Sequence, residues 1–188
     1  MEKSEWMTSL SGDLLVPKTH MRIAFRGLID TLEAEVIEAQ VLAAGTGEPV
    51  ASPRATGFTE SEVCTCLGEI LEYLRAIMAA EVKETPLPPP FLFGMDSGEI
   101  HRRSHVFVSD ANGKPLLPAY TQGLLAARLN TLRAKVREAE LLAVRVFGPA
   151  PDQAHETSGA LREDIILGLN RLSSALWWLY CEHVRRKK

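Results

Sequence analysis

Apolar residues recur at spacings of three and four in four stretches of the chain, which is the pattern of amphipathic helices. We expect these helices at about 17–44, from 59 to the proline-rich residues 85–90, at about 120–147 and at about 158–184. The third is the most regular, with an apolar seam in alternating steps of four and three: Leu125, Leu129, Leu132, Val136, Ala139, Ala143 and Val146. No stretch has a competing strand pattern. The sequence therefore predicts an all-α fold, an antiparallel bundle of four to five helices in one domain over residues 1–188.

The segments between the helices carry turn and cap signals. Glycines and prolines fill residues 45–57, and Thr59 with Glu62 three residues later predicts a capping box at the start of the second helix. Residues 85–119 contain no sustained period, and loops of this length in compact domains tend to be functional. We expect a long ordered loop there, with a short turn near His101 and a hairpin at Asn112-Gly113.

Composition excludes several classes of protein. Hydrophobic residues make up 46% of 188 residues, enough for one packed core. The formal net charge of −3 argues against a nucleic-acid partner, which would need an excess of basic residues. No segment has the apolar length of a membrane span or the pattern of a leader, and three cysteines do not make a disulfide framework. We therefore expect a cytoplasmic protein with no membrane partner.

Polar residues of the third helix share one face. Asn130, Arg133, Arg137 and Glu140 follow at steps of three, four and three, within an arc of about sixty degrees. Two arginines and one carboxylate on a single face could hold an anionic ligand. The alternative is an ordinary solvated helix face, or salt bridges within a structural bundle.

Two further helices carry polar groups in line. Asn170 interrupts an apolar pattern in the fourth helix, where a polar group needs a partner. In the first helix Lys18, Arg22 and Arg26 follow at steps of four, so that three cations could grip a polyphosphate. The chain has neither of the two common glycine-rich phosphate motifs, so any nucleotide must be held by side chains.

A protein-bound metal is the weaker possibility. His101 and His105 could share a metal if their segment is helical, with Cys64 and Cys66 completing the site. Helical neighbours two residues apart point in different directions, however, which does not suit the two cysteines. We expect no metal held by the protein alone.

Four stretches of the chain resemble the ATP:cob(I)alamin adenosyltransferase family, nearest to its ethanolamine-utilisation branch, with wider similarity to the PduO-type enzymes. They are residues 16–34, 101–105, 129–140 and 169–174. The most specific signal is the Arg, Arg, Glu series of the third stretch followed by Asn-Arg-Leu-Ser in the fourth. The resemblance implies a homotrimer of helical bundles with ATP at each interface.

The resemblance also implies roles for individual residues. Lys18 and Arg137 would bind the phosphates of ATP, Asn170 would contact the nucleotide, and Glu140 would lie near phosphate-bound Mg²⁺. We add Arg22, Arg26 and Arg133 to this expected ATP site because they share its charged faces. Asp30 would pair with Arg133 of a neighbouring subunit, which would tie the site to assembly.

The implied reaction moves the 5′-deoxyadenosyl group of ATP onto the Co(I) of a corrinoid, with electrons supplied by a reductase. Aromatic side chains in this family fill the space left by the lower axial ligand of the cobalt. Phe91, Phe93 and Phe107 are our candidates, and His101 and His105 lie in the same loop as further corrinoid-binding candidates. The alternative is that the three rings pack permanently against the bundle.

Two departures from the family pattern matter, and the first of them keeps a second function open. The glycine-rich Thr-Gly-Asp nucleotide loop is represented at most by residues 11–13, Ser-Gly-Asp, and Ser174 stands where an acidic residue often closes the Asn-Arg-Leu-Ser motif. The rival interpretation is a corrinoid- or ATP-binding carrier or assembly protein of the same fold that does not adenosylate.

Overall fold

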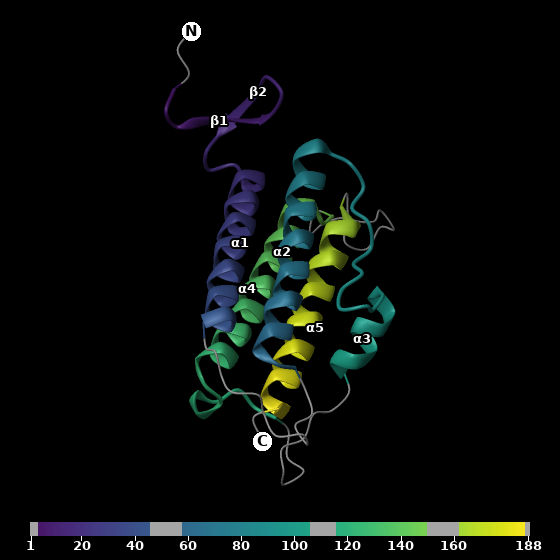
Figure 1. Cartoon of the computed structure of the whole chain (residues 1–188). Helices are drawn as coiled ribbons and strands as arrows, with labels where there is room; N and C mark the ends of the chain where they lie inside the picture. The colour runs from purple at the N-terminus through teal and green to yellow at the C-terminus, as the bar shows by residue number, and fades with distance from the viewer. Residues whose placement is uncertain (1–3, 46–57, 106–115, 150–161, 187–188) are drawn as a thin grey trace.

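Long helices lie side by side in an antiparallel bundle in the computed structural model, which describes residues 4–45, 58–105, 116–149 and 162–186 (Figure 1). They are α1 (Met21–Gly45), α2 (Glu60–Lys83), α4 (Leu124–Phe147) and α5 (Glu163–Arg186). α1 packs against α2 and α4, and α5 packs against the same two helices from the opposite side. This arrangement confirms the predicted helical bundle; the expected trimer and the single domain stay predictions.

The buried stripes of the helices form one hydrophobic cluster. The predicted seam of α4 is buried from Leu125 to Ala143, and Val146 at its end is half-buried and packs against the core. In α1 the buried stripe passes through Ile29, which is fully buried, whereas Leu28, one residue before it, is only half-buried. The buried stripe of α1 therefore advances by four residues from Phe25 to Ile29 and by three from Ile29 to Leu32.

Helix ends follow local chemistry more closely than periodicity. The Thr59 hydroxyl accepts a hydrogen bond from the Glu62 amide at 3.0 Å, and Glu62 Oε2 accepts one from the Thr59 amide at 2.6 Å, so the predicted capping box is confirmed. α2 ends at Lys83, before the prolines, and Glu84 adopts a left-handed conformation with φ of 55°. α1 begins at Met21 rather than near residue 17, and a short 3₁₀ turn, η1 (Tyr120–Gln122), precedes α4.

A β-hairpin at the N-terminal end corrects the expectation that the chain has no strands. β1 (Met7–Ser11) pairs antiparallel with β2 (Leu14–Pro17), beside the start of α1 (Figure 1). Each strand is short and buries a single residue, Leu10 in β1 and Val16 in β2, so neither shows an alternating pattern in the sequence. Gly12, with φ of 50°, lies in the turn between the strands.

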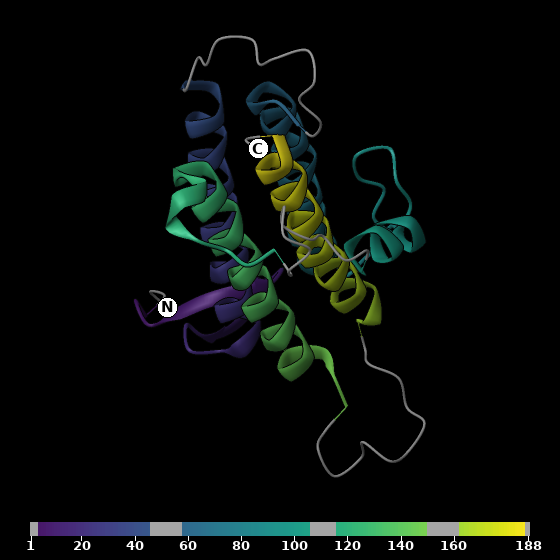
Figure 2. The same cartoon turned by 90° about the horizontal axis from the view of Figure 1, so that it is seen from below.

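The long segment after α2 contains more structure than the predicted turn near His101. A nine-residue helix, α3 (Ser97–His105), packs against α5 and lies outside the bundle (Figures 1 and 2). Before it, Leu92 and Met95 exchange backbone hydrogen bonds across a tight turn. The expected hairpin at Asn112-Gly113 lies outside the described residues. Among those that are described, no helix is both long and apolar enough to cross a membrane.

Candidate functional site

A hydrogen-bonded carboxylate and amide join α4 to α5. Glu140 on α4 accepts a hydrogen bond at Oε1 from Asn170 Nδ2 on α5, at 2.8 Å. Arg171 Nη1 donates to the Asn170 oxygen at 2.5 Å, so both ends of the amide are occupied. Both Glu140 and Asn170 are half-buried. The structure thus brings together two residues, thirty positions apart, that the sequence predicted to share an ATP site.

Arg133 lies on the same face of α4, against aromatic rings of α5. Its Nε donates to Asn130 Oδ1 at 3.1 Å, and its guanidinium lies 5.5 Å from the centre of the Trp177 ring. Trp177 in turn stacks on Tyr180, with ring centres 5.3 Å apart. Burial lowers the pKa of Arg133, and the nearby positive charge of Arg137 adds to this effect.

The positive charge of this face is not neutralised by carboxylates. Arg137 is exposed, and within the described residues neither Arg137 nor Arg133 makes a salt bridge. Two neighbouring guanidinium groups that make no ion pair raise the local positive potential, which favours an anionic ligand. Arg side chains suit phosphate in particular, because their planar donors match its oxygens.

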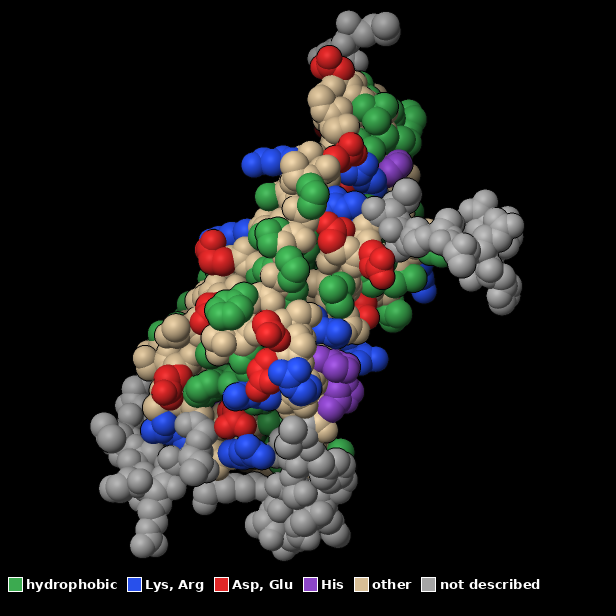
Figure 3. All heavy atoms as spheres, turned by 90° about the vertical axis from the view of Figure 1, so that its right-hand side faces the viewer, with side chains coloured by type: hydrophobic (Ala, Val, Ile, Leu, Met, Phe, Trp, Pro, Cys, Tyr) green, Lys and Arg blue, Asp and Glu red, His purple; other side chains and the backbone are tan. Residues whose placement is uncertain are grey.

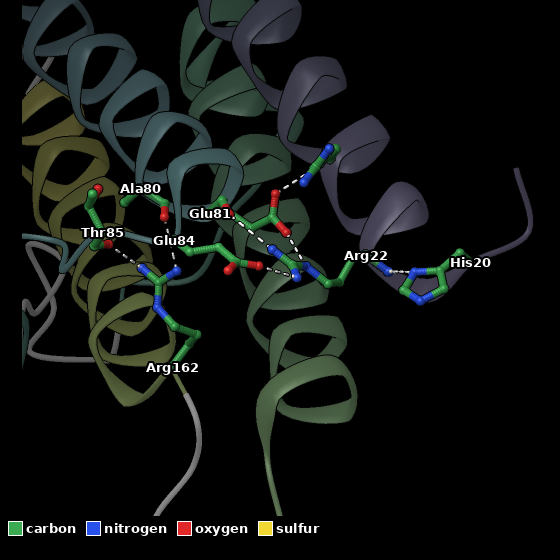
Figure 4. Close-up of polar contacts among 8 residues, drawn as sticks. His20, Arg22, Ala80, Glu81, Glu84, Thr85 and Arg162 are labelled. Carbon is green, nitrogen blue, oxygen red and sulfur yellow. Dashed lines mark hydrogen bonds and ion pairs between the residues drawn. The ribbon is translucent and has the colours of Figure 1, made fainter. Parts of the chain in front are cut away.

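The cations predicted on α1 have a different environment. Glu81 of α2 is fully buried between them, and its carboxylate accepts from Arg22 Nε at 2.5 Å and from Arg26 Nε (Figure 4). Arg22 Nη1 also donates to Glu84 at 2.8 Å. Arg26 Nη2 is buried and has no hydrogen-bond partner in the described part of the chain. Lys18, by contrast, is exposed just after β2.

Sequence reasoning missed Glu81, although a signal for it exists. Glu81 lies four residues after Ile77, on the buried stripe of α2, where a charged residue needs partners from another helix. At the same end of the bundle, Arg162 donates to the Ala80 and Thr85 carbonyl oxygens, both at 3.0 Å (Figure 4). These bonds join Arg162, just before α5, to the C-terminal end of α2 and the residues that follow it.

Asp30 and Arg133, the expected intersubunit pair, form no ion pair within the described part of one chain. Asp30 is exposed on α1, while Arg133 faces α5. α1 and α4 are instead joined by other ion pairs, Lys135 with Glu35 and, at 3.2 Å, Arg128 with Glu38. The pairing of Asp30 with Arg133 requires a second subunit and stays a prediction.

The loop phenylalanines differ in exposure. Phe93 has φ of 59°, stacks on Trp178 with ring centres 5.7 Å apart, and donates its amide to Glu69 at 2.6 Å. Phe91 is 69% exposed. Phe107 lies outside the described residues. Phe93 therefore packs against the bundle in this structure, whereas Phe91 is available to an external ligand.

Histidine side chains lie beside basic side chains on the face of the molecule that carries α3 (Figure 3). His101 and His105 are exposed on α3 with ring centres 4.4 Å apart. Desolvation lowers the pKa of His101, and the positive charges of Arg171 and His105 lower it further. Both effects favour the neutral form of the His101 imidazole.

The cysteines considered as metal ligands lie elsewhere. Cys64 and Cys66 belong to α2, whereas the two histidines belong to α3. Burial raises the pKa of the Cys66 thiol to about 12, which keeps it protonated and a poor ligand. No group of three or more His, Cys, Asp or Glu side chains suited to a metal ion occurs among the described residues.

Taken together, the α4–α5 face has the chemistry of a site for a phosphate-bearing ligand. Arg133 and Arg137 supply unpaired positive charge, and Glu140 offers its second carboxylate oxygen to a hard divalent cation carried by the ligand. Trp177, half-buried beside Arg133, adds an apolar surface. We name these residues, with Asn170, the α4–α5 face.

Comparison with known proteins gives a consistent result. The sequence profile of the family described as Cobalamin adenosyltransferase matches residues 3–183. The chain is 32% identical over 177 residues to the protein named Corrinoid adenosyltransferase EutT of Salmonella typhimurium, and 31% identical over 176 residues to that of Escherichia coli K12. Each alignment covers 94% of this chain and 58% of the relative, so the chain spans less than two thirds of either. These matches confirm the resemblance seen in the sequence, including its ethanolamine-utilisation branch.

Proposed function

Because the chain belongs to the cobalamin adenosyltransferase family, we propose that it transfers the 5′-deoxyadenosyl group of ATP to the cobalt of a corrinoid. The observation that carries the proposal is the α4–α5 face, where Glu140 and Asn170 are hydrogen-bonded beside the unpaired charges of Arg133 and Arg137. The names of the relatives, corrinoid adenosyltransferases, support the same activity.

The proposed step is a nucleophilic substitution at the C5′ carbon of ATP. The electron pair of Co(I) forms the new cobalt–carbon bond, the C5′–oxygen bond breaks, and triphosphate leaves with that electron pair. Negative charge grows on the leaving oxygen, so cations at the phosphates stabilise the transition state. We assign this role to Arg137 and Lys18, with Mg²⁺ held near Glu140. The cobalt is the nucleophile, and the chain binds and orients the two substrates.

The corrinoid side of the site rests on the segment around α3. We propose that Phe91, exposed beside this segment, contacts the lower face of the corrinoid and helps to expel the axial ligand of Co(II). A four-coordinate Co(II) is easier to reduce, and a separate reductase would supply the electron. We further propose a homotrimer, in which Asp30 of one subunit reaches Arg133 of the next, acting in the cytoplasm.

The test is a spectroscopic assay under anaerobic conditions. Protein, Mg-ATP and chemically reduced Co(I) corrinoid are mixed, and the absorbance of the adenosylated product is followed against a sample without ATP. We expect product and stoichiometric triphosphate only in the complete mixture. Absence of product in the presence of demonstrated ATP and corrinoid binding would refute the enzyme.

The rival function is a carrier that binds ATP or corrinoid without transfer. The position of Gly12 and Asp13 favours this rival. These residues stand where the family has its glycine-rich nucleotide loop, and here they form the exposed turn of the β-hairpin. The Ser9 hydroxyl donates to the Gly12 carbonyl oxygen at 2.6 Å, so this turn is closed on itself. A carrier would bind the corrinoid in the same assay and leave its spectrum that of the cofactor supplied.

A further inference from the structure

Arg171 connects α3 to the α4–α5 face. Its Nε donates to the Ser97 hydroxyl on α3 at 3.1 Å, and its Nη1 donates to the Asn170 oxygen at 2.5 Å. Asn170 then donates to Glu140 on α4 at 2.8 Å. A continuous series of hydrogen bonds therefore runs from α3 through α5 to α4.

The chemistry of this series fixes the direction of the Asn170 amide. A guanidinium only donates hydrogen bonds, so Arg171 must meet the amide oxygen, and a carboxylate accepts, so Glu140 must meet the amide nitrogen. A flipped amide would place its NH₂ against the guanidinium and its oxygen against the carboxylate. Arg171 thereby holds Asn170 in one orientation and keeps one Glu140 oxygen engaged.

The other end of the series lies where the corrinoid segment begins its helix. Ser97 is the first residue of α3, and α3 packs against α5. Asp96 Oδ1 accepts the Glu99 amide at 2.7 Å, which fixes the first turn of α3 close to Ser97. A ligand that shifts or steadies α3 will therefore act on the hydroxyl that Arg171 holds.

We propose that Arg171 is a positioning residue that couples the α3 segment to the nucleotide-binding residues, so that corrinoid and ATP each strengthen the binding of the other. Such coupling is reciprocal by thermodynamic necessity. The inference rests on the proposed function, because it takes the α4–α5 face as the ATP site and the α3 segment as the corrinoid site. Arg171 touches neither substrate; it acts through Asn170.

The experiment uses the full chain with Mg-ATP and Co(II) corrinoid in the absence of any reductant, so that no transfer occurs. The ATP dissociation constant is measured by calorimetry with and without saturating corrinoid. In the wild type we expect corrinoid to tighten ATP binding by about five- to tenfold. The ratio of the ATP dissociation constant without corrinoid to that with corrinoid measures the coupling. Ser97→Ala removes only the hydrogen bond to α3, so this ratio should fall to about one, while ATP binding without corrinoid stays close to wild type.

Arg171→Met keeps the aliphatic stem but loses all donors. We expect it to weaken ATP binding and to abolish the ratio, because the Asn170 amide is no longer held. Ser104→Ala is the matched control: its hydroxyl donates at 2.8 Å to the His101 carbonyl oxygen within α3, so the ratio should remain that of the wild type. Circular dichroism and thermal melting verify folding, and Ser97→Ala decides the question if Arg171→Met does not fold.

The binding measurements test the coupling, and product formation tests the proposed function, so the two can fail independently. A wild type that adenosylates the corrinoid, with a ratio unchanged by Ser97→Ala, overturns the coupling alone. A ratio of one in the wild type overturns it as well. A wild type that shows the ratio and its loss in Ser97→Ala, yet forms no adenosylated product, supports the coupling and overturns the enzyme.

Discussion

Replacing Glu81 by alanine tests whether its buried carboxylate holds the end of the bundle together. The Glu81 side chain is 0% exposed, and it accepts hydrogen bonds from Arg22 and Arg26, whose side chains are 21% and 16% exposed (Figure 4). Glu81→Ala leaves both guanidiniums without this partner and away from most of the solvent. The bundle would then contain two poorly compensated charges between α1 and α2.

The magnitude follows from what each arginine retains. Removal of one partner from a buried ion pair costs about 3–5 kcal/mol. Arg22 keeps the Glu84 carboxylate at 2.8 Å and the backbone carbonyl of residue 81 at 3.0 Å, and both arginines keep some access to water. We therefore expect a loss near the lower end, about 3 kcal/mol in the free energy of unfolding. For a domain of this size, that corresponds to a melting temperature lower by about 6–12 °C.

The measurement is denaturant and thermal unfolding followed by circular dichroism. Glu84→Ala is the matched control, since it removes a second carboxylate from Arg22 at an exposed position, and it should lower the melting temperature far less. Glu81→Gln, which keeps the shape and one acceptor oxygen, should fall between the two. If Glu81→Ala and Glu84→Ala melt together, close to the wild type, the buried carboxylate makes no net contribution and the reasoning is wrong.

Three substitutions test the proposed site. Arg137→Ala should weaken ATP binding about ten- to a hundredfold, because a charge-assisted phosphate contact contributes about 1.5–3 kcal/mol. Arg145 is exposed on the same helix, and Arg145→Ala should leave ATP binding unchanged. Equal effects of the two substitutions would show that Arg137 is not part of the site. Asp30→Ala should lower activity and loosen the assembly together, and sedimentation showing a fully active monomeric wild type would contradict it. Phe91→Ala should leave the melting temperature unchanged and abolish the spectrum of four-coordinate Co(II), because Phe91 is exposed. Phe93→Ala should lower the melting temperature, because Phe93 stacks on Trp178. A four-coordinate signal that persists in Phe91→Ala would refute the proposed contact of Phe91 with the corrinoid.

Periodicity predicted the long helices because each of them buries a continuous stripe. The predicted seam of α4 is buried from Leu125 to Ala143, and α5 buries a stripe through Leu169, Leu172 and Leu176. It did not predict β1, β2 or the full length of α3. These short elements bury few residues, such as Leu10 in the hairpin and Ile100 in α3, so they leave no repeating signal for a pattern to detect.

Spacing also predicted which polar residues share a helix face, but not what lies opposite them. Arg133, Arg137 and Glu140 follow from steps along one helix. The bond from Asn170 to Glu140 depends on how α5 packs beside α4, and no local rule in the sequence gives that register. In the sequence Arg171 is only the residue that follows Asn170, and its contact with α3 depends on a helix that the sequence did not predict in full.

The two groups of arginines looked equivalent in the sequence, and the structure separates them by their counter-charges. A phosphate that binds Arg22 and Arg26 must compete with Glu81, and winning would leave a fully buried carboxylate unpaired. A phosphate at Arg137 displaces no carboxylate of the described chain and relieves repulsion between two neighbouring cations. These charges therefore favour phosphate binding on α4. Arg22 and Arg26 instead join α1 to α2 through Glu81, close to Lys18 in the sequence.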